Sequence, residues 1–206
     1  MNKLYIAFLL LVFSNCKNEA PQYSKNSSPL FDLKGFLDNE IATHLKDVKK
    51  VKKTVTVNGK TETKEVEIKD WKEELKPFFN SDINRPAWLD KYRFEEVKNI
   101  AKKSSPHNPL SSTIYGYIHN DIPYSSLKSY ITKDKNLRTK EISEFTSYEY
   151  KDTTIEHKGI LIENLENNSI FVSKQNLLYN KHLYSIESIQ TSFLGNKDTV
   201  IISVEY

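Results

Sequence analysis

"VKKTVTVNGKTETKEVEI", residues 51–68, is the stretch that decides the fold. Two runs rich in Val and Thr flank Asn58-Gly59, a dipeptide that readily adopts the two positive φ angles of a type I′ turn. A two-residue loop sets Lys52 opposite Glu65, an opposite-charge pair that favours neighbouring antiparallel strands. The stretch therefore predicts a β-hairpin, and because its faces are polar beyond the base, we expect an arm whose tip projects into solvent.

Strand-like runs also fill the C-terminal part of the chain. In the last of them Val200, Ile202 and Val204 alternate with other residues, the period of a half-buried strand. Turn residues separate the runs, and short connections join antiparallel neighbours. A segment containing Pro and Ser, residues 119–136, is interpreted as an interruption. The predicted strands cover residues 91–97, 113–118, 140–150, 154–162, 169–174, 183–194 and 199–206.

Helices are predicted before and after the hairpin. Apolar residues recur every three or four positions from Leu30 to Val48, which predicts an amphipathic helix. A second helix begins after the N-cap Asp70, and it is expected to kink or restart at Pro77, which lacks a backbone donor. The predicted fold class is α+β, with N-terminal helices packed on an antiparallel, curved β-sheet.

The first 15 residues have the three parts of a secretory signal. Lys3 is the positive end, residues 4–13 are apolar, and Ser14-Asn15 is a small polar end. The apolar run is shorter than the roughly 20 residues that cross a bilayer as a helix. We therefore expect a signal peptide at 1–15, a lipidated cysteine and flexible tether at 16–29, and a single α+β domain at 30–206.

Cys16 is the only cysteine in the chain, and it directly follows this signal. The segment Phe13-Ser14-Asn15-Cys16 resembles the lipobox of bacterial lipoproteins, in the looser form of the Bacteroidota. The resemblance implies that the signal is cut before Cys16 and that its sulfur carries a diacylglycerol with palmitate-type chains. It also implies a lipid-anchored protein of the outer membrane, on the periplasmic face or the cell surface.

Residues 70–88 carry a second resemblance. The pattern of uncharacterised Bacteroidota lipoproteins is resembled by four segments: Asp70-Trp71-Lys72, Pro77-Phe78, Ser81-Asp82-Ile83-Asn84 and Pro86-Ala87-Trp88. No known activity comes with this pattern.

The leading function hypothesis is a non-enzymatic envelope lipoprotein. Membrane lipid is its expected partner through acylated Cys16, together with an envelope protein or a small ligand. Aromatic side chains on a curved sheet can grip a sugar, peptide or lipid, although Tyr is also favoured on half-exposed strands. The candidate binding residues are Tyr115, Tyr117, Tyr148 and Tyr150.

An envelope hydrolase is the alternative hypothesis, acting through the polar residues from Ser81 to Arg85 or through His119. A nucleophilic serine needs a base within hydrogen-bond reach, whereas Asp and Asn side chains at a helix exit also serve as backbone caps.

The sequence offers little support for binding of a metal, a phosphate group, a cofactor or a nucleic acid. The five histidines lack the close spacing of a metal-ligand pair, no glycine loop for phosphate is present, and no cofactor is expected. With 30 basic and 27 acidic residues, the chain lacks the positive excess of a nucleic-acid-binding protein.

Overall fold

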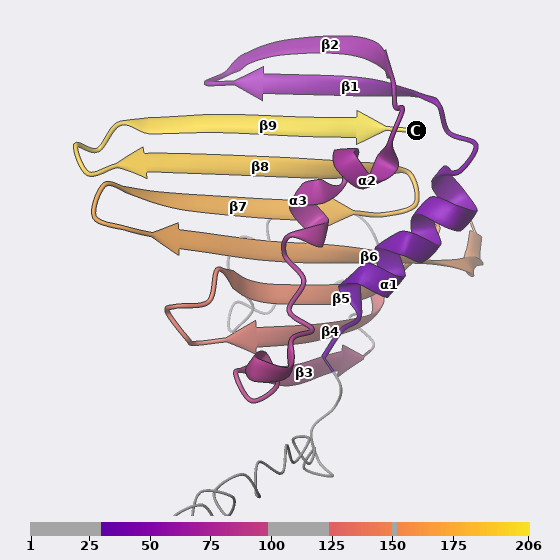
Figure 1. Cartoon of the computed structure of the whole chain (residues 1–206). Helices are drawn as coiled ribbons and strands as arrows, with labels where there is room; N and C mark the ends of the chain where they lie inside the picture. The colour runs from indigo at the N-terminus through magenta and orange to yellow at the C-terminus, as the bar shows by residue number, and fades with distance from the viewer. Residues whose placement is uncertain (1–29, 99–123, 150–151) are drawn as a thin grey trace, which may run out of the picture.

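The computed structural model describes residues 30–98, 124–149 and 152–206, and Figure 1 shows that they form one broad sheet with short helices beside it. The sheet has nine described strands, all paired antiparallel, in the order β2-β1-β9-β8-β7-β6-β5-β4-β3. The strands are β1 (Lys50–Val57), β2 (Lys60–Glu67), β3 (Tyr92–Lys98), β4 (Tyr124–Thr132), β5 (Thr139–Glu149), β6 (Asp152–Asn167), β7 (Phe171–Tyr179), β8 (Leu183–Ser192) and β9 (Lys197–Glu205). The helices are α1 (Leu33–Glu40), α2 (Trp71–Glu74) and α3 (Lys76–Phe79), with a π-helical turn at Ile41–Leu45 and a 3₁₀ turn at Pro86–Trp88.

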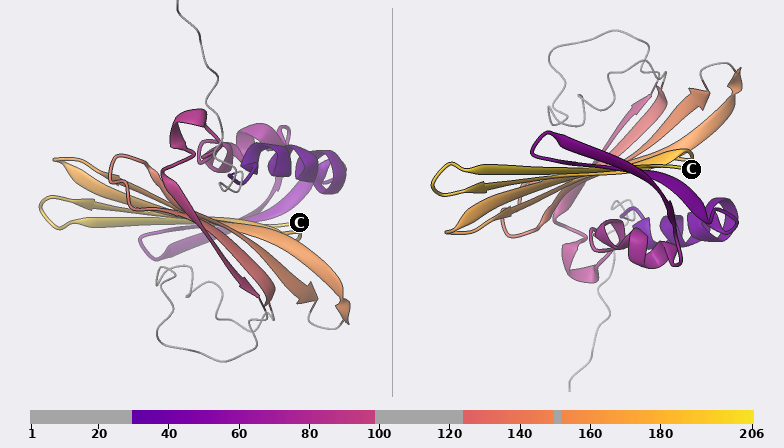
Figure 2. Two further views of the ribbon diagram at one scale, coloured as in Figure 1. Left: turned by 90° about the horizontal axis from the view of Figure 1, so that it is seen from below. Right: turned by 90° about the horizontal axis from the view of Figure 1, so that it is seen from above.

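The topology of the sheet is a meander with one addition. Strands β3 to β9 follow one another in sequence order, and the β1–β2 hairpin joins the meander beside β9. The sheet does not close, because β2 and β3 are its two edges. Figure 2 shows that it is strongly twisted, as strands of L-residues require. The antiparallel sheet of the predicted α+β class is thus confirmed, as an open sheet with few helices.

The hairpin forms in the predicted register. Lys52 lies opposite Glu65, and Asn58 and Gly59 have φ values of 48° and 83°. The expectation of a free arm is wrong, because β1 also pairs with β9 over Lys52–Val57. At the turn, the backbone N–H of Asn58 donates to the Thr199 carbonyl at 2.9 Å. The hairpin is therefore an integral part of the sheet.

Most of the predicted strands are present, and one strand was missed. Predicted runs correspond to β3 and to β5 through β9, whereas β4 occupies the segment interpreted as an interruption. Its serines belong to the sheet, since Ser129 Oγ lies 2.6 Å from Ser143 Oγ on β5. The predicted strand at 113–118 lies outside the described residues.

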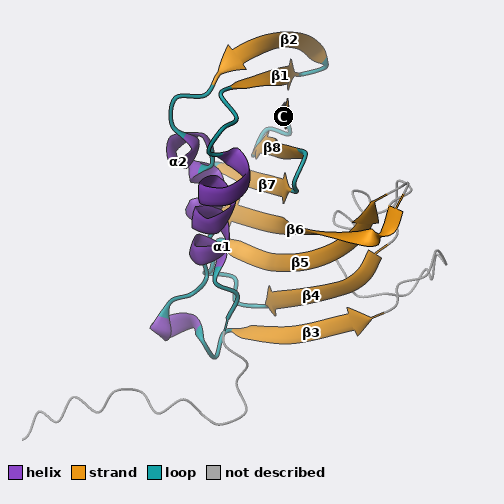
Figure 3. Ribbon diagram, turned by 90° about the vertical axis from the view of Figure 1, so that its right-hand side faces the viewer, coloured by secondary structure: helices purple, strands orange, loops and turns teal. Residues whose placement is uncertain are grey.

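The helices lie on one face of the sheet in Figure 3. Leu33 and Leu37 of α1 are fully buried and belong to the same apolar cluster as Ile142, Ile160 and other sheet residues. The ring of Phe78 on α3 meets that of Tyr179 on β7 edge-on, at 6.2 Å between centroids. As expected from Pro77, the second helix is divided, with α2 ending at Glu74 and α3 starting at Lys76.

The opposite face of the sheet has a smaller apolar group. Leu127, Phe145 and Leu161 are almost fully buried but lie outside the main cluster. Gly159 on β6 pairs with Phe145 on β5, and the phenyl ring lies directly over it. A Cβ atom at Gly159 would lie 2.2 Å from Cζ of Phe145. Glycine is therefore required here for space.

Replacing Gly159 with Ala is expected to lower the free energy of unfolding by about 1–3 kcal/mol, the usual cost of overpacking. Chemical denaturation measures the change. In the Phe145→Leu background the same substitution should cost less, because the smaller side chain makes room for the new methyl group. An equal cost in both backgrounds would contradict the steric explanation.

Candidate functional site

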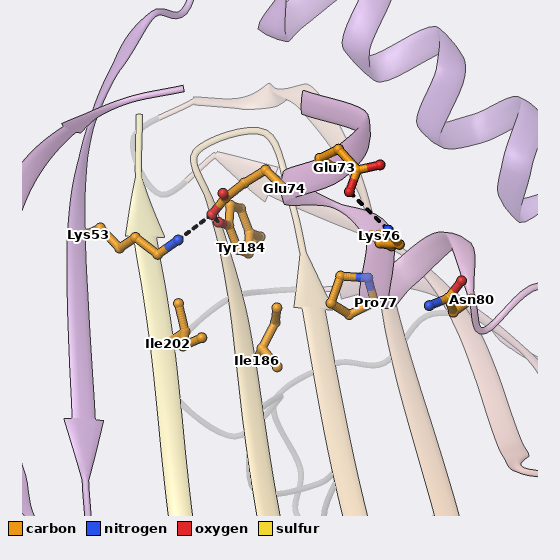
Figure 4. A pocket seen from close by; sticks show the side chains of 9 residues that line it. All are labelled: Lys53, Glu73, Glu74, Lys76, Pro77, Asn80, Tyr184, Ile186 and Ile202. Atoms are coloured by element: carbon orange, nitrogen blue, oxygen red, sulfur yellow. Dashed lines mark hydrogen bonds and ion pairs between the residues drawn. The ribbon is translucent and has the colours of Figure 1, made fainter. Parts of the chain in front are cut away.

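A hollow of about 330 Å³ lies between the α2–α3 segment and strands β1, β9 and β8. Figure 4 shows its side chains projecting from the helical segment and from the sheet toward a common space. The lining residues are Lys53, Glu73, Glu74, Lys76, Pro77, Asn80, Tyr184, Ile186 and Ile202.

The floor of the hollow is apolar and its mouth is charged. Ile186 and Ile202 lie directly opposite each other on β8 and β9 and form the floor. At the mouth, Lys76 Nζ on α3 lies 3.0 Å from an oxygen of Glu73 on α2, and both side chains are well exposed. An apolar floor with a few polar groups around it is the usual composition of a small-molecule site.

One carboxylate, that of Glu74, connects the helical segment to the sheet. Lys53 Nζ on β1 lies 2.5 Å from Glu74 Oε1, and the hydroxyl of Tyr184 on β8 donates to the same oxygen. Burial raises the pKa of Tyr184, and the neighbouring Glu74 raises it further. The phenol therefore stays protonated and keeps donating at physiological pH, which fixes one wall of the hollow.

Ser81, which the hydrolase hypothesis named, is fully buried just after α3. Its hydroxyl donates to the Pro77 carbonyl at 3.0 Å and accepts from Asn164 Nδ2 at 2.8 Å. The proton of Ser81 is directed at a backbone carbonyl and not at a base. Through its bonds to Pro77 and Asn164, Ser81 holds the end of α3 against β6.

The polar residues after Ser81 also have structural contacts. The Asp82 carboxylate accepts the backbone N–H of Asn84 at 3.1 Å, and the Arg85 guanidinium lies 4.4 Å from the Trp88 ring centroid. The structure thus gives these residues capping and stacking contacts. His119, the other hydrolase candidate, lies outside the described residues.

The residues predicted for binding and anchoring fall mostly outside the described part of the chain. This applies to Cys16, Tyr115, Tyr117 and Tyr150. Tyr148 belongs to β5 through its backbone, opposite Glu156, and its side chain is outside the described part. The tyrosine at the hollow is Tyr184, which the sequence analysis did not single out. The strand-like run at residues 183–194 predicted its strand, and only the register with β9 shows its neighbours.

A second polar group lies on the sheet face opposite the helices. Ser143 Oγ donates to Glu141 Oε1 at 2.9 Å and contacts Ser129, and all three residues are buried. Burial raises the pKa of Glu141, and the carboxylate of Glu163 on β6 adds to the rise, whereas the bond from Ser143 opposes it. Lys174 Nζ lies 3.2 Å from Glu163. The cluster thus holds a buried carboxyl group whose pKa lies above its ordinary value.

Within the described ranges, no three His, Cys, Asp or Glu side chains are arranged to hold a metal ion. No described helix combines the length and the apolar character needed to span a membrane. No family profile, curated protein or solved structure matches this chain.

The raised pKa of Glu141 predicts a pH dependence of stability. Between its ordinary value of 4.5 and the higher folded value, the folded state binds more protons than the unfolded state, so stability falls as pH rises. Glu141→Gln removes this loss and still accepts the bond from Ser143. Relative to the parent, we expect the variant to gain stability as the pH rises from 4 to 7, because it has no carboxyl group to deprotonate.

Denaturation at several pH values measures this effect. The control is Glu62→Gln, since the Glu62 side chain on β2 is 70% exposed. A stability difference between Glu141→Gln and the parent that does not change with pH would contradict a raised pKa at Glu141.

Proposed function

We propose that the protein is a membrane-anchored envelope lipoprotein that binds a small ligand, or a side chain of a partner protein, and has no enzymatic activity. In this proposal the N-terminal helices pack as a layer on the curved sheet, and the hollow beneath α2 and α3 is the binding site. The lipid chains on Cys16 hold the protein to the outer membrane.

The observation that carries the binding proposal is the hollow itself. The paired residues Ile186 and Ile202 offer an apolar floor, while Lys76 and Glu73 offer opposite charges at the exposed mouth. A ligand with an apolar body and a charged end would bury its body on the floor and meet a counter-charge at the mouth. Charge-assisted bonds of this kind give orientation and specificity.

The hydrolase alternative has less support. The Ser81 hydroxyl is buried and bonded to Pro77 and Asn164, and Asp82 caps the following backbone. A nucleophile must reach both a base and a substrate. Neither requirement is met by these contacts, so binding is the better proposal for this region.

The anchor proposal rests on the sequence around Cys16. A single acyl chain gives only reversible attachment, with an association constant on the order of 10⁴ M⁻¹, whereas two or more hold a protein stably. A diacylglycerol on Cys16 supplies two.

Replacing Cys16 with Ser is expected to abolish lipidation, because the hydroxyl cannot replace the sulfur as acceptor. Metabolic labelling with an alkyne fatty acid should mark the parent and leave the variant unmarked. The matched control is Ser14→Ala, which keeps the sulfur. Label retained by the Cys16→Ser variant would rule out this anchor.

Filling the hollow is expected to weaken the binding of an amphiphilic probe. Asn80 is exposed at the mouth, so Asn80→Trp should occupy the space without disturbing the core. With 1-anilinonaphthalene-8-sulfonate, whose sulfonate suits Lys76 and whose rings suit the floor, we expect at least severalfold weaker binding. Fluorescence titration measures it, with Lys133→Trp as the control on an exposed loop. Equal binding by both variants would remove the hollow as the binding site.

A further inference from the structure

Two neighbouring hairpin ends carry apolar side chains that point into solvent. Ile170 at the β6–β7 turn is 65% exposed, and Phe193 and Leu194 at the β8–β9 turn are 76% and 73% exposed. Val172, at the start of β7, is 39% exposed. We call these four residues the tip patch. Both turns lie at the same end of the sheet in Figure 1.

The tip patch is held by a well-bonded backbone. The N–H of Phe193 donates to the Ile170 carbonyl at 3.0 Å, which joins the two turns directly. Asn168 Oδ1 accepts the N–H groups of Ile170 and Phe171, and Gly195, with φ of 85°, turns the second hairpin back. These bonds therefore fix the backbone positions from which the exposed side chains project.

The size of the tip patch suits a lipid surface better than a protein partner. A fully buried aromatic side chain contributes about 150–250 Å², so four partly exposed apolar side chains offer on the order of 400 Å². A stable protein interface needs about 800 Å² per partner. Side chains at the ends of strands can enter the boundary between headgroups and acyl chains without burying the polar faces of the sheet.

The exposed lysines near the tip patch also suit an anionic lipid surface. Lys197 is exposed on the β8–β9 hairpin, and Lys60 is exposed on the adjoining β1–β2 hairpin. The nearby Asp198 carboxylate accepts from Asn58 Nδ2 at 3.0 Å, and the two lysines outnumber it. Exposed lysines beside an apolar patch attract anionic headgroups.

The proposed anchor brings the patch within reach of a bilayer. Fourteen peptide steps separate Cys16 from Leu30, the first described residue, and such a chain spans at most about 50 Å. A domain of this size has a radius of gyration of roughly 16 Å. The chain length therefore lets any end of the domain turn toward the membrane.

We infer that the tip patch is a second membrane contact, in which Ile170, Phe193 and Leu194 insert into an anionic lipid surface. The inference rests on the proposed membrane attachment for its setting and goes beyond it in assigning a lipid-binding surface to the folded domain. The contact orients the sheet so that its strand ends at the β6–β7 and β8–β9 turns face the bilayer.

The test places a polarity-sensitive dye at the patch of the full chain. Because Cys16 is the only cysteine, Cys16→Ser combined with Phe193→Cys gives one site for an NBD label. Vesicles of phosphatidylethanolamine and phosphatidylglycerol should shift its emission to shorter wavelength and increase its intensity. The label at Glu62→Cys, on exposed β2, should keep its aqueous spectrum. Any attachment by the N-terminal segment is common to both labelled proteins.

A second variant tests the neighbouring side chains. Ile170→Ser with Leu194→Ser should weaken the apparent vesicle affinity reported at position 193 about tenfold, because both side chains are predicted to lose lipid contact. An aqueous spectrum at position 193 on vesicles would overturn the inference. A shift produced by excess unlabelled chain without vesicles would also overturn it, by assigning the patch to a second copy. This test is independent of the test of the lipid anchor, since every labelled protein has the Cys16→Ser substitution and cannot be lipidated at that position.

Discussion

The pairing of β1 with β9 is the interaction on which the rest of the structure depends. It places the first described strand beside the last, with Val57 opposite Val200 and Lys52 opposite Glu205. Segments about 150 residues apart thereby meet, at an entropy cost that grows only slowly with the length of the intervening chain. The pairing brings Lys53 to Glu74, and Asn58 to Asp198. Both the hollow and the bonded turn beside the tip patch follow from this one register.

Local features could be predicted from the sequence because local chemistry determines them. Asn58-Gly59 fixes the turn and register of the β1–β2 hairpin, and Pro77 divides the helix that Asp70 caps. Strand β4 was missed because its serines are typical of loops, whereas here Ser129 is buried and bonded to Ser143. A side-chain pattern alone does not distinguish a serine that faces water from one that faces a neighbouring strand.

The candidate site was beyond prediction for a different reason. Glu74 and Tyr184 are 110 residues apart, and their contact requires that α2 lie over β8. Nothing near either residue in the sequence specifies the other. The same holds for Glu141 and Glu163, which stand opposite each other only in the register of β5 with β6. Burial of one carboxyl group beside another is a property of strand order, and strand order emerges from the whole chain.

The open edge at β2 has a consequence for many copies of this chain at high local concentration. An unpaired edge exposes backbone donors and acceptors to which another strand can add. Here the edge strand is almost entirely exposed and carries Lys60, Glu62, Lys64, Glu65 and Glu67. An incoming strand would have to strip water from these charges and match their mixed signs. A charged, exposed edge of this kind disfavours strand addition between copies and so opposes the growth of fibres.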